Sequence, residues 1–286
     1  MTVDRPAVPP RVWLSDRGIL FTDLDGTLLD FDSYRPSQSA QTLVDVMARD
    51  GILTVPVTSK TAAEVVEITG SVRLAPVAVV EGGAVLLLED GSTTIVGSRR
   101  EVLIDVLRAL RDDGWDVRGF SDMTTHELAD LTGLDHAAAR RAMERSASEP
   151  FLIAPPVPQE IEELHRRASE LGAGITRGGR FWHLIGQGID KGSGVQVVLE
   201  TIGRDRPTTT GAVGDAWNDV PMLECVDYPY FLGTRVPPAQ LPPGVHRISE
   251  VGPGGFVRAA RAFRTVCMMG PGRGAQDRPA GAASRE

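Results

Sequence analysis

Short apolar runs alternate along this chain with stretches of helical periodicity, and this alternation constrains the fold more than any other feature. It is typical of strand–helix–strand units, in which helices cover both faces of a parallel sheet. The sequence therefore predicts an α/β fold with a Rossmann-like parallel-sheet core. Strands are expected at residues 18–21, 52–57, 77–80, 208–213 and 228–232, and helices at 37–50, 62–69, 192–202, from 214 onward and at 256–266.

The middle of the chain follows a different pattern. Two pairs of short runs, 84–88 with 93–96 and 174–177 with 180–185, flank turn sequences and predict antiparallel hairpins. A strand at 117–120 and helices at 124–132 and 136–148 are expected between them. We interpret this region as an inserted α+β cap domain. The predicted domains are core at 16–85, cap at 86–187 and core again at 188–268, with a flexible arm at 1–15 and a disordered tail at 269–286, for which an anionic partner is an alternative.

Charge and composition exclude several classes of function. The chain has 286 residues, with 30 Lys and Arg against 38 Asp and Glu, and its net charge of −8 argues against a dedicated nucleic-acid binder. No apolar run reaches the ~18 residues of a membrane span, and no signal-peptide pattern is visible. Two distant cysteines, Cys225 and Cys267, fit a reducing compartment. We expect a cytoplasmic protein without membrane or nucleic-acid partners, and the sequence leaves its oligomeric state open.

Lysine is almost absent from the chain. Of the 30 basic residues, only Lys60 and Lys191 are lysine, and all others are arginine. A compact ammonium and a planar guanidinium are not interchangeable in a binding site. These two positions are therefore candidates for a functional cation.

Four polar clusters follow predicted strands or begin predicted helices. Ligands bind beyond the carboxyl ends of the strands in open parallel sheets, so these positions are candidates for a site. In the first cluster, DLDGT, Asp23 and Asp25 are followed by Gly26 and Thr27, which can bend the backbone and supply amide donors. An isolated pair of carboxylates at this spacing would more often be a turn cap, but the Gly-Thr that follows favours an anion and metal site.

The other three clusters are TSKT at 58–61, DKG at 190–192 and GDAWND at 214–219. The Ser and Thr residues of TSKT are either helix N-caps or, at Thr58, a ligand-binding hydroxyl. Lys191 lies at a predicted helix start, where a cation is disfavoured unless an anion binds there. Asp215 and Asp219 are either ordinary helix-start acids or metal ligands.

Together the four clusters resemble, in type, order and spacing, the motifs of the haloacid dehalogenase-like phosphatases, over residues 17–266. The segments PVTSKTAAEV, FSDMTTHELADLTGL, RRAMERSASEPF and GRFWHLIGQGIDKG resemble those of mannosyl-3-phosphoglycerate phosphatases in particular. The resemblance implies hydrolysis of mannosyl-3-phosphoglycerate, a phosphorylated glycoside, to mannosylglycerate and phosphate in compatible-solute biosynthesis. Glucosyl-3-phosphoglycerate and sucrose or trehalose phosphates are alternative substrates, and a catalytically idle regulatory module is the alternative of a different class.

The resemblance also implies a role for each residue of the motifs. Asp23 attacks phosphorus to form an aspartyl-phosphate, while Asp25 protonates the leaving alkoxide and later activates water. Thr58 and Lys191 contact the phosphate. Mg²⁺ is held by Asp23, the backbone carbonyl of Asp25 and Asp215, with Asp219 as a further ligand, beside metal-bound water or orienting Lys191. Asn218 lies beside the metal or orients Lys191, and is also a candidate for substrate contact.

Substrate recognition is expected to come mainly from the cap. A carboxylate and a sugar rim call for an Arg fork and polar groups that bind hydroxyls. Lys60 is expected at the glycerate end, and the cap candidates are Arg145, Glu149, Arg180 and His183. For the arginines and Lys60 the alternative is a solvated surface charge, and for His183 a packing role. Glu81 with its two following glycines either contacts sugar hydroxyls or only turns the chain into the cap.

Overall fold

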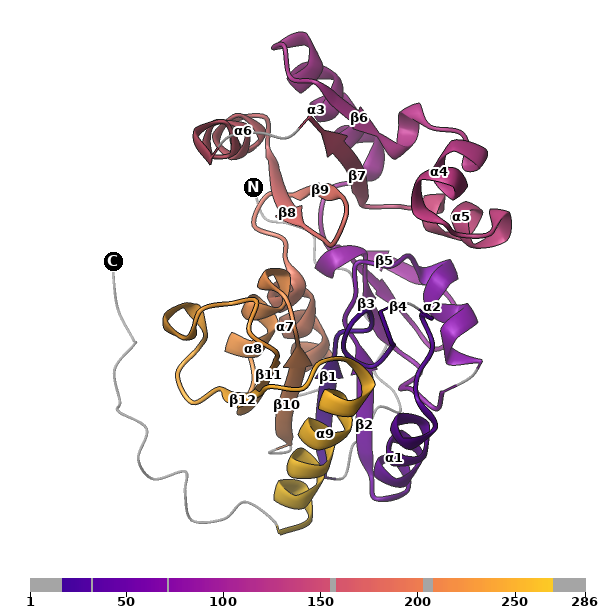
Figure 1. The fold of residues 1–286 in the computed structure, drawn as a ribbon, viewed down its shortest axis with the longest axis vertical. Helices are drawn as coiled ribbons and strands as arrows, with labels where there is room; N and C mark the ends of the chain where they lie inside the picture. Colours follow the sequence, from indigo (N-terminus) through magenta and orange to yellow (C-terminus); the bar gives the residue numbers. More distant parts are fainter. Residues whose placement is uncertain (1–16, 32, 71, 155–157, 203–207, 270–286) are drawn as a thin grey trace.

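The computed structural model describes residues 17–31, 33–70, 72–154, 158–202 and 208–269, and its central element is a five-stranded sheet (Figure 1). All neighbouring strands in this sheet are parallel, which confirms the predicted α/β class. The predicted arm at 1–15 and residues 270–286 of the predicted tail lie outside the described residues. The strand order is β12 (His246–Ile248), β11 (Tyr228–Leu232), β10 (Thr209–Gly214), β1 (Gly18–Thr22) and β2 (Ile52–Pro56).

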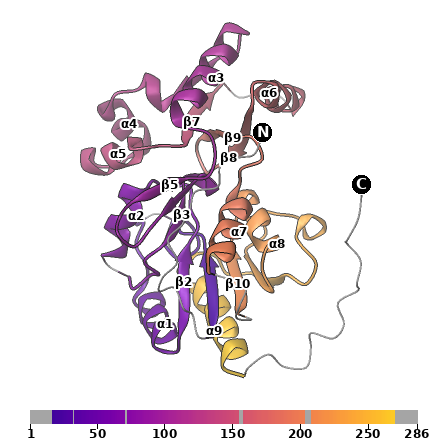
Figure 2. The ribbon, with the colours of Figure 1, turned by 180° about the vertical axis from the view of Figure 1, so that it is seen from behind.

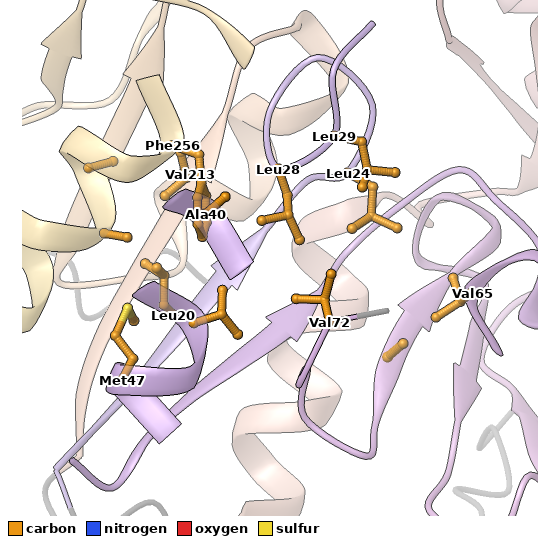
Figure 3. Packing of buried hydrophobic residues seen from close by; sticks show 14 of the residues in the cluster. Leu20, Leu24, Leu28, Leu29, Ala40, Met47, Val65, Val72, Val213 and Phe256 are labelled. Atoms are coloured by element: carbon orange, nitrogen blue, oxygen red, sulfur yellow. The ribbon is translucent and has the colours of Figure 1, made fainter. Parts of the chain in front are cut away.

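Helices cover both faces of this sheet (Figures 1 and 2). Side chains of β1 alternate between two apolar clusters, with Leu20 on one face and Ile19 and Phe21 on the other, as in a strand buried on both sides. Figure 3 shows Leu20 on the first face, together with Met47 and Phe256 from two covering helices. The first face is covered by α1 (Gln38–Arg49) and α9 (Gly252–Met269), and the second by α7 (Lys191–Ile202) and α8 (Val220–Glu224).

The core helices begin where the sequence supplies caps. The Ser37 hydroxyl accepts the Ala40 amide at the start of α1, and Thr61 and Glu64 form a reciprocal capping box at the start of α2 (Ala62–Thr69). The predicted helices at 37–50 and 62–69 are thus confirmed. The closing helix α9 is longer than the predicted 256–266, because it begins at Gly252 with Pro253 in its first turn, where a missing amide does no harm.

The described residues of the cap form a four-stranded antiparallel sheet with four helices, and the cap lies above the core in Figure 1. Two of its helices, α3 (Arg100–Asp112) and α6 (Pro158–Glu170), pack against the sheet through Leu107, Leu164 and neighbouring apolar residues. The other two, α4 (Thr125–Thr132) and α5 (His136–Met143), pack around Leu128, and α5 also contacts α2 of the core. The strand order is β6 (Val117–Gly119), β7 (Ser148–Ile153), β9 (Trp182–Gly186) and β8 (Ala173–Arg177).

The expected helix at 136–148 is wrong at its carboxyl end. Helix α5 stops at Met143, and β7 begins at Ser148 between β6 and β9. Pro150 disfavours helical backbone at Glu149, so the helix cannot continue through this segment. No alternation of polar and apolar residues marks β7, because its first four residues are all buried in the sheet.

A second small sheet joins core and cap. It pairs β3 (Ala78–Val80) with β4 (Val85–Leu87) and β4 with β5 (Thr93–Ile95), confirming the first predicted hairpin, and Val79 bridges to Val57 beside the central sheet. The expected cap boundary at residue 86 therefore falls inside a strand that pairs with the core. The segment that enters the cap at Ser98 and the segment that leaves it at Gly186 lie side by side, because a Cβ on Gly186 would lie 2.8 Å from the Ser98 amide. We propose residues 98–187 as the cap.

Among the residues that the structure describes, no helix combines the length and the hydropathy that a membrane span requires.

Candidate active site

The loop after β1 holds two carboxylates in a tight turn. Leu29 donates its amide to Leu24, and Gly26 donates to Leu29, so the DLDGT segment folds back on itself. Gly26 has a φ of 81°, and a Cβ there would lie 3.2 Å from a carboxylate oxygen of Asp215. Glycine is therefore required at this position both for the turn and for the close approach of the second acidic loop.

The loop after β10 brings in two further carboxylates. Oδ2 of Asp219 accepts the backbone amides of Asp215 and Ala216, each at 2.9 Å. Asp219 also approaches Gly214 so closely that a Cβ there would lie 2.4 Å from it. The spacing in GDAWND thus lets Asp219 shape its own loop and leaves the Asp215 carboxylate beside the β1 loop, where Thr27 donates to its Oδ1 at 3.2 Å.

Lys191, the first residue of α7, lies between the two loops and is only 2% exposed. Its Nζ is 2.7 Å from Oδ1 of Asp23 and 2.5 Å from Oδ1 of Asp219. Burial by itself lowers the pKa of Lys191, but Asp219 and Asp23 outweigh it and raise the pKa above its usual value. Lys191 is therefore a permanent cation next to Asp23.

The carboxylates nevertheless remain crowded. Burial, with Asp219 and Asp215, raises the pKa of Asp23 well above its usual value against the opposing effect of Lys191. Burial also raises the pKa of Asp215 to about 6, with Asp219 adding to the rise and Arg235 opposing it. Both groups thus lie where additional positive charge would stabilise the ionised form.

The oxygen cluster fits a hard divalent cation. Asp23, Asp215 and Asp219 are buried, and each places an oxygen within 4.8 Å of the others. Carboxylate oxygens are the ligands that Mg²⁺ prefers. Asp219 already uses one oxygen for Lys191 and the other for two amides, so it is better suited to hold the loop and the lysine than to bind metal directly.

Asp25 and Lys60 form a second pair at the edge of the site. Lys60 Nζ is 3.0 Å from Oδ2 of Asp25, 3.7 Å from Glu64, and 5.0 Å from the centre of the Tyr34 ring. Oδ1 of Asp25 is buried and has no hydrogen-bond partner among the described residues. Because the Lys60 side chain is only 15% exposed and holds these contacts, the surface-lysine alternative is excluded. Both lysines of the chain therefore contact carboxylates of the site.

Thr58 is not a helix cap. Helix α2 begins at Ala62 and its cap is Thr61, while Thr58 is 1% exposed at the end of β2. The Thr58 oxygen accepts the Lys60 amide at 3.2 Å, so its hydroxyl proton is available to a ligand.

The four cap candidates divide into two pairs. Arg145 reaches the core, where its Nη1 donates to the carbonyl of Ser59 at 3.1 Å. The half-buried His183 has its pKa lowered to about 3 by burial and by the charges of Arg145 and Lys191, so its ring is neutral and near the site. Arg180 instead donates to the Leu131 carbonyl within the cap.

Glu149 corrects one of our expectations. It is 0% exposed, and its carboxylate is held inside the cap by Arg100 at 2.7 Å and by the Ser121 amide at 2.7 Å. A side chain without exposure and with these partners supports the cap rather than touching substrate. Asn218 is half-buried on the short helix Trp217–Asp219 beside Asp215.

Sequence reasoning missed Arg235. Its Nη1 lies 3.0 Å from Oδ2 of Asp215, and its guanidinium lies 5.8 Å from the centre of the Phe31 ring. Arg235 follows β11, so its place beyond the carboxyl end of another parallel strand was the available signal. Arg235, Lys60 and Lys191 thus contact four aspartates of the candidate site, which are Asp23, Asp25, Asp215 and Asp219.

Known proteins resemble this chain in sequence and in fold. A family model described as haloacid dehalogenase-like hydrolase matches residues 156–240. A glucosyl-3-phosphoglycerate/mannosyl-3-phosphoglycerate phosphatase from Persephonella marina is 36% identical over 230 residues, and one with the same name from Methanococcoides burtonii is 32% identical over 236. Each alignment covers 75% of this chain and 84% of the relative.

The fold is also that of solved structures. A phosphatase of the haloalkanoate superfamily from Bacteroides thetaiotaomicron aligns with a TM-score of 0.66 over 91% of this chain and 98% of its own, at 20% identity. At that identity the match establishes a common fold of core and cap.

Proposed function

Since the chain belongs to the haloacid dehalogenase-like hydrolases, in the family of the glucosyl-3-phosphoglycerate/mannosyl-3-phosphoglycerate phosphatases, we propose that it is a Mg²⁺-dependent phosphatase of mannosyl-3-phosphoglycerate. The products are mannosylglycerate and phosphate. The observation that carries the proposal is the position of Asp23, buried against Lys191 and facing Asp215 at the end of the parallel sheet.

Asp23 is the nucleophile. One of its oxygens is bonded to Lys191, which fixes the carboxylate and places a cation where phosphate charge would lie. Attack on phosphorus forms an aspartyl-phosphate and breaks the bond to the alkoxide of the glycerate. Asp25 gives its proton to that alkoxide, then takes a proton from the water that hydrolyses the aspartyl-phosphate.

One oxygen of the Asp25 carboxyl is not engaged by another group in the described part of the chain, which supports this double role. Its Oδ1 has no partner among the described residues, while Lys60 holds Oδ2. Lys60 thereby fixes the direction of the group, and in this proposal it binds the carboxylate of the leaving glycerate. Thr58 donates its hydroxyl to a phosphate oxygen from the end of the neighbouring strand.

Asp23, Asp215 and the backbone carbonyl of Asp25 would hold Mg²⁺, with Asp219 orienting Lys191. Bound there, the metal supplies positive charge that offsets the repulsion between the Asp23 carboxylate and the phosphate dianion. Burial is the main cause of the raised pKa values of Asp23 and Asp215, and repulsion from neighbouring aspartates adds to both, so a bound cation would stabilise the ionised carboxylates. Arg235, on Asp215, stabilises the same cluster.

Arg145 and His183 are proposed as the cap's substrate contacts. Arg145 Nη2 makes no hydrogen bond to the part of the chain that the structure describes and offers two donors to a carboxylate. His183 is uncharged, so its ring can both donate to and accept from sugar hydroxyls. Asn218 keeps its place as a further candidate, whereas Arg180 is bonded to Leu131 instead.

Glucosyl-3-phosphoglycerate is the second candidate substrate. Both curated relatives carry both substrates in their names, and the two sugars differ in the orientation of one hydroxyl. Selection between them would depend on hydroxyl contacts such as those of His183, since the glycerate phosphate is common to both.

Phosphate release from purified protein tests the proposal. With Mg²⁺, both glycosyl-3-phosphoglycerates are assayed beside sucrose phosphate and trehalose phosphate, and each assay is repeated with EDTA. We expect fast release from mannosyl-3-phosphoglycerate and loss of activity with the chelator. Equal rates on all four compounds would rule out the substrate assignment, and full activity in EDTA would rule out the metal.

A further inference from the structure

Glu81 has an unusual backbone for its residue type. It has a φ of 51°, and Tyr34 is the other non-glycine residue with positive φ in the described part of the chain. Gly82 and Gly83 follow it and also have positive φ. Glycine would adopt the conformation of Glu81 without strain, so a glutamate here indicates a task for its side chain.

The Glu81 carboxylate is only 3% exposed and binds the cap. Oε1 accepts the Ser146 amide at 2.8 Å, and Oε2 accepts the Ala147 amide at 3.0 Å and the Ser148 hydroxyl at 2.6 Å. Ser146 and Ala147 lie between α5 and β7, and Ser148 is the first residue of β7. Both oxygens accept hydrogen bonds from the cap, and Glu81 is almost without exposure, so its carboxylate is turned to the cap rather than to the sugar hydroxyls considered above.

The backbone around Glu81 binds the other side of the junction. The Glu81 amide donates to the Lys60 carbonyl at 2.8 Å, and the Gly82 amide donates to the Thr58 carbonyl at 2.9 Å. The main chain of residues 81–82 therefore binds the loop 58–60, while the side chain of Glu81 binds the cap segment 146–148.

Two more contacts cross the same junction. Arg145 Nη1 bridges the Ser59 carbonyl and the Ser148 hydroxyl, at 3.1 and 2.9 Å. The Thr61 hydroxyl donates to the Arg141 carbonyl at 2.8 Å. Ser148 thus binds both Glu81 and Arg145, and the position of the Arg145 guanidinium depends on the seating of residues 146–148.

We propose that Glu81 is a positioning residue that seats the cap segment 146–148 on the loop 58–60 and thereby places Arg145 over the site. It touches neither phosphate nor nucleophile. Its loss should weaken turnover of substrates whose recognition needs the cap, and leave hydrolysis of a small phosphate ester at Asp23 unchanged. The inference rests on the proposed phosphatase function for its kinetic part only.

The test compares Glu81→Gln with a matched control, Glu149→Gln. Both residues are buried glutamates that accept backbone amides, but Glu149 is bonded only within the cap among the described residues. Glutamine keeps one acceptor oxygen and turns an amide donor toward the remaining donors, so it cannot satisfy the Ser146 and Ala147 amides together. A second variant, Glu81→Gly, removes the carboxylate together with the strain and covers the case in which the glutamine variant fails to fold.

Hydrogen exchange of the Ser146 and Ala147 amides is the first readout. Loss of the acceptor should raise exchange at least about tenfold at both amides in Glu81→Gly and at one of the two in Glu81→Gln, while Glu149→Gln should raise exchange at Ser121 instead. Unchanged exchange at residues 146 and 147 would overturn the inference. This readout does not depend on which compound the enzyme hydrolyses.

The second readout is kinetic. For Glu81→Gln we expect kcat/KM for mannosyl-3-phosphoglycerate to fall about tenfold and that for p-nitrophenyl phosphate to stay within about twofold. An equal fall for both compounds, or the same selective fall in Glu149→Gln, would show a merely structural role and overturn the inference. If wild-type protein hydrolyses neither glycosyl-phosphoglycerate, the proposed substrate is wrong, and the exchange result alone decides whether Glu81 seats the cap.

Discussion

Asp23 in the core and Glu149 in the cap are both buried carboxylates, but their surroundings differ. Glu149 has a dedicated cation, Arg100, and a backbone amide, both 2.7 Å away. Asp23 shares Lys191 with Asp219 and faces Asp215 as well, so one cation serves two of three neighbouring carboxylates.

This difference separates a structural charge from one held ready for a ligand. A buried charge with its own partners stabilises the fold around it, and removing one partner leaves the other unpaired. Crowded carboxylates with raised pKa values destabilise the metal-free protein and are typical of functional sites. The same residue chemistry thus has opposite consequences for stability in the two domains, and substitution can test this.

Exchanging each carboxylate for its amide gives the largest expected contrast. Asp23→Asn should lower phosphate release at least about 10³-fold, because an amide is no nucleophile, while the melting temperature stays equal or rises as crowding is relieved. Glu149→Gln should keep the activity and lose about 2 kcal/mol of unfolding free energy, because Arg100 loses its partner. The measurements are phosphate release and urea unfolding of both proteins.

Active Asp23→Asn protein would remove the nucleophile from the proposal. Strong destabilisation of Asp23→Asn with a stable Glu149→Gln would reverse the comparison, since it would make Asp23 the structural group.

The Lys191→Met variant measures how much the shared cation contributes to stability and to turnover. Its removal leaves Asp23 and Asp219 without the cation that both contact, so we expect about 3 kcal/mol of destabilisation and about a 10³-fold loss of turnover. Lys191→Arg should restore neither stability nor turnover, because a guanidinium does not fit a position that is 2% exposed between two carboxylates. Full activity of the arginine variant would show that only the charge matters there.

The clustering of the candidate site residues in the core was predictable because its signals are local. Each acidic cluster follows a strand of the parallel sheet, and the geometry of such sheets brings strand ends together without further information. Even the count of lysines was informative, since Lys60 and Lys191 both contact site aspartates. Arg235 was not predicted from the sequence because a single arginine after a strand belongs to no recognisable motif.

The cap was less predictable because its charges are satisfied by distant residues. Nothing near Glu149 in sequence shows that Arg100 will neutralise it, and Arg180 differs from Arg145 only in the partner that tertiary packing supplies. The strand β7 was hidden for the same reason, since its burial comes from both neighbouring strands rather than from its own pattern.

The same contrast between a group near the site and a group bonded elsewhere can be tested in the cap with Arg145 and Arg180. Arg145→Ala should raise KM for mannosyl-3-phosphoglycerate about tenfold, because it removes a cation that reaches the core loop at Ser59. Arg180→Ala should change KM less than about twofold, since that side chain is exposed and bonded to Leu131. Initial-rate kinetics of the two variants decide this, and a larger effect at Arg180 would return it to the substrate contacts.

His183 gives the smallest effect, on stability rather than turnover. Its folded pKa of about 3 lies below the ~6.5 of an unfolded histidine, so the unfolded chain binds the proton more readily, and stability falls as pH drops from about 6.5 toward 3. Because the ring is only half-buried, we expect about 1 kcal/mol by pH 5. Urea unfolding of His183→Gln at pH 7 and 5 should lack this loss, whereas the control His126→Gln, at a side chain 80% exposed, should retain it. Identical pH profiles for wild type and His183→Gln would mean that folding does not lower the pKa of His183, and would contradict the neutral, partly buried ring proposed here.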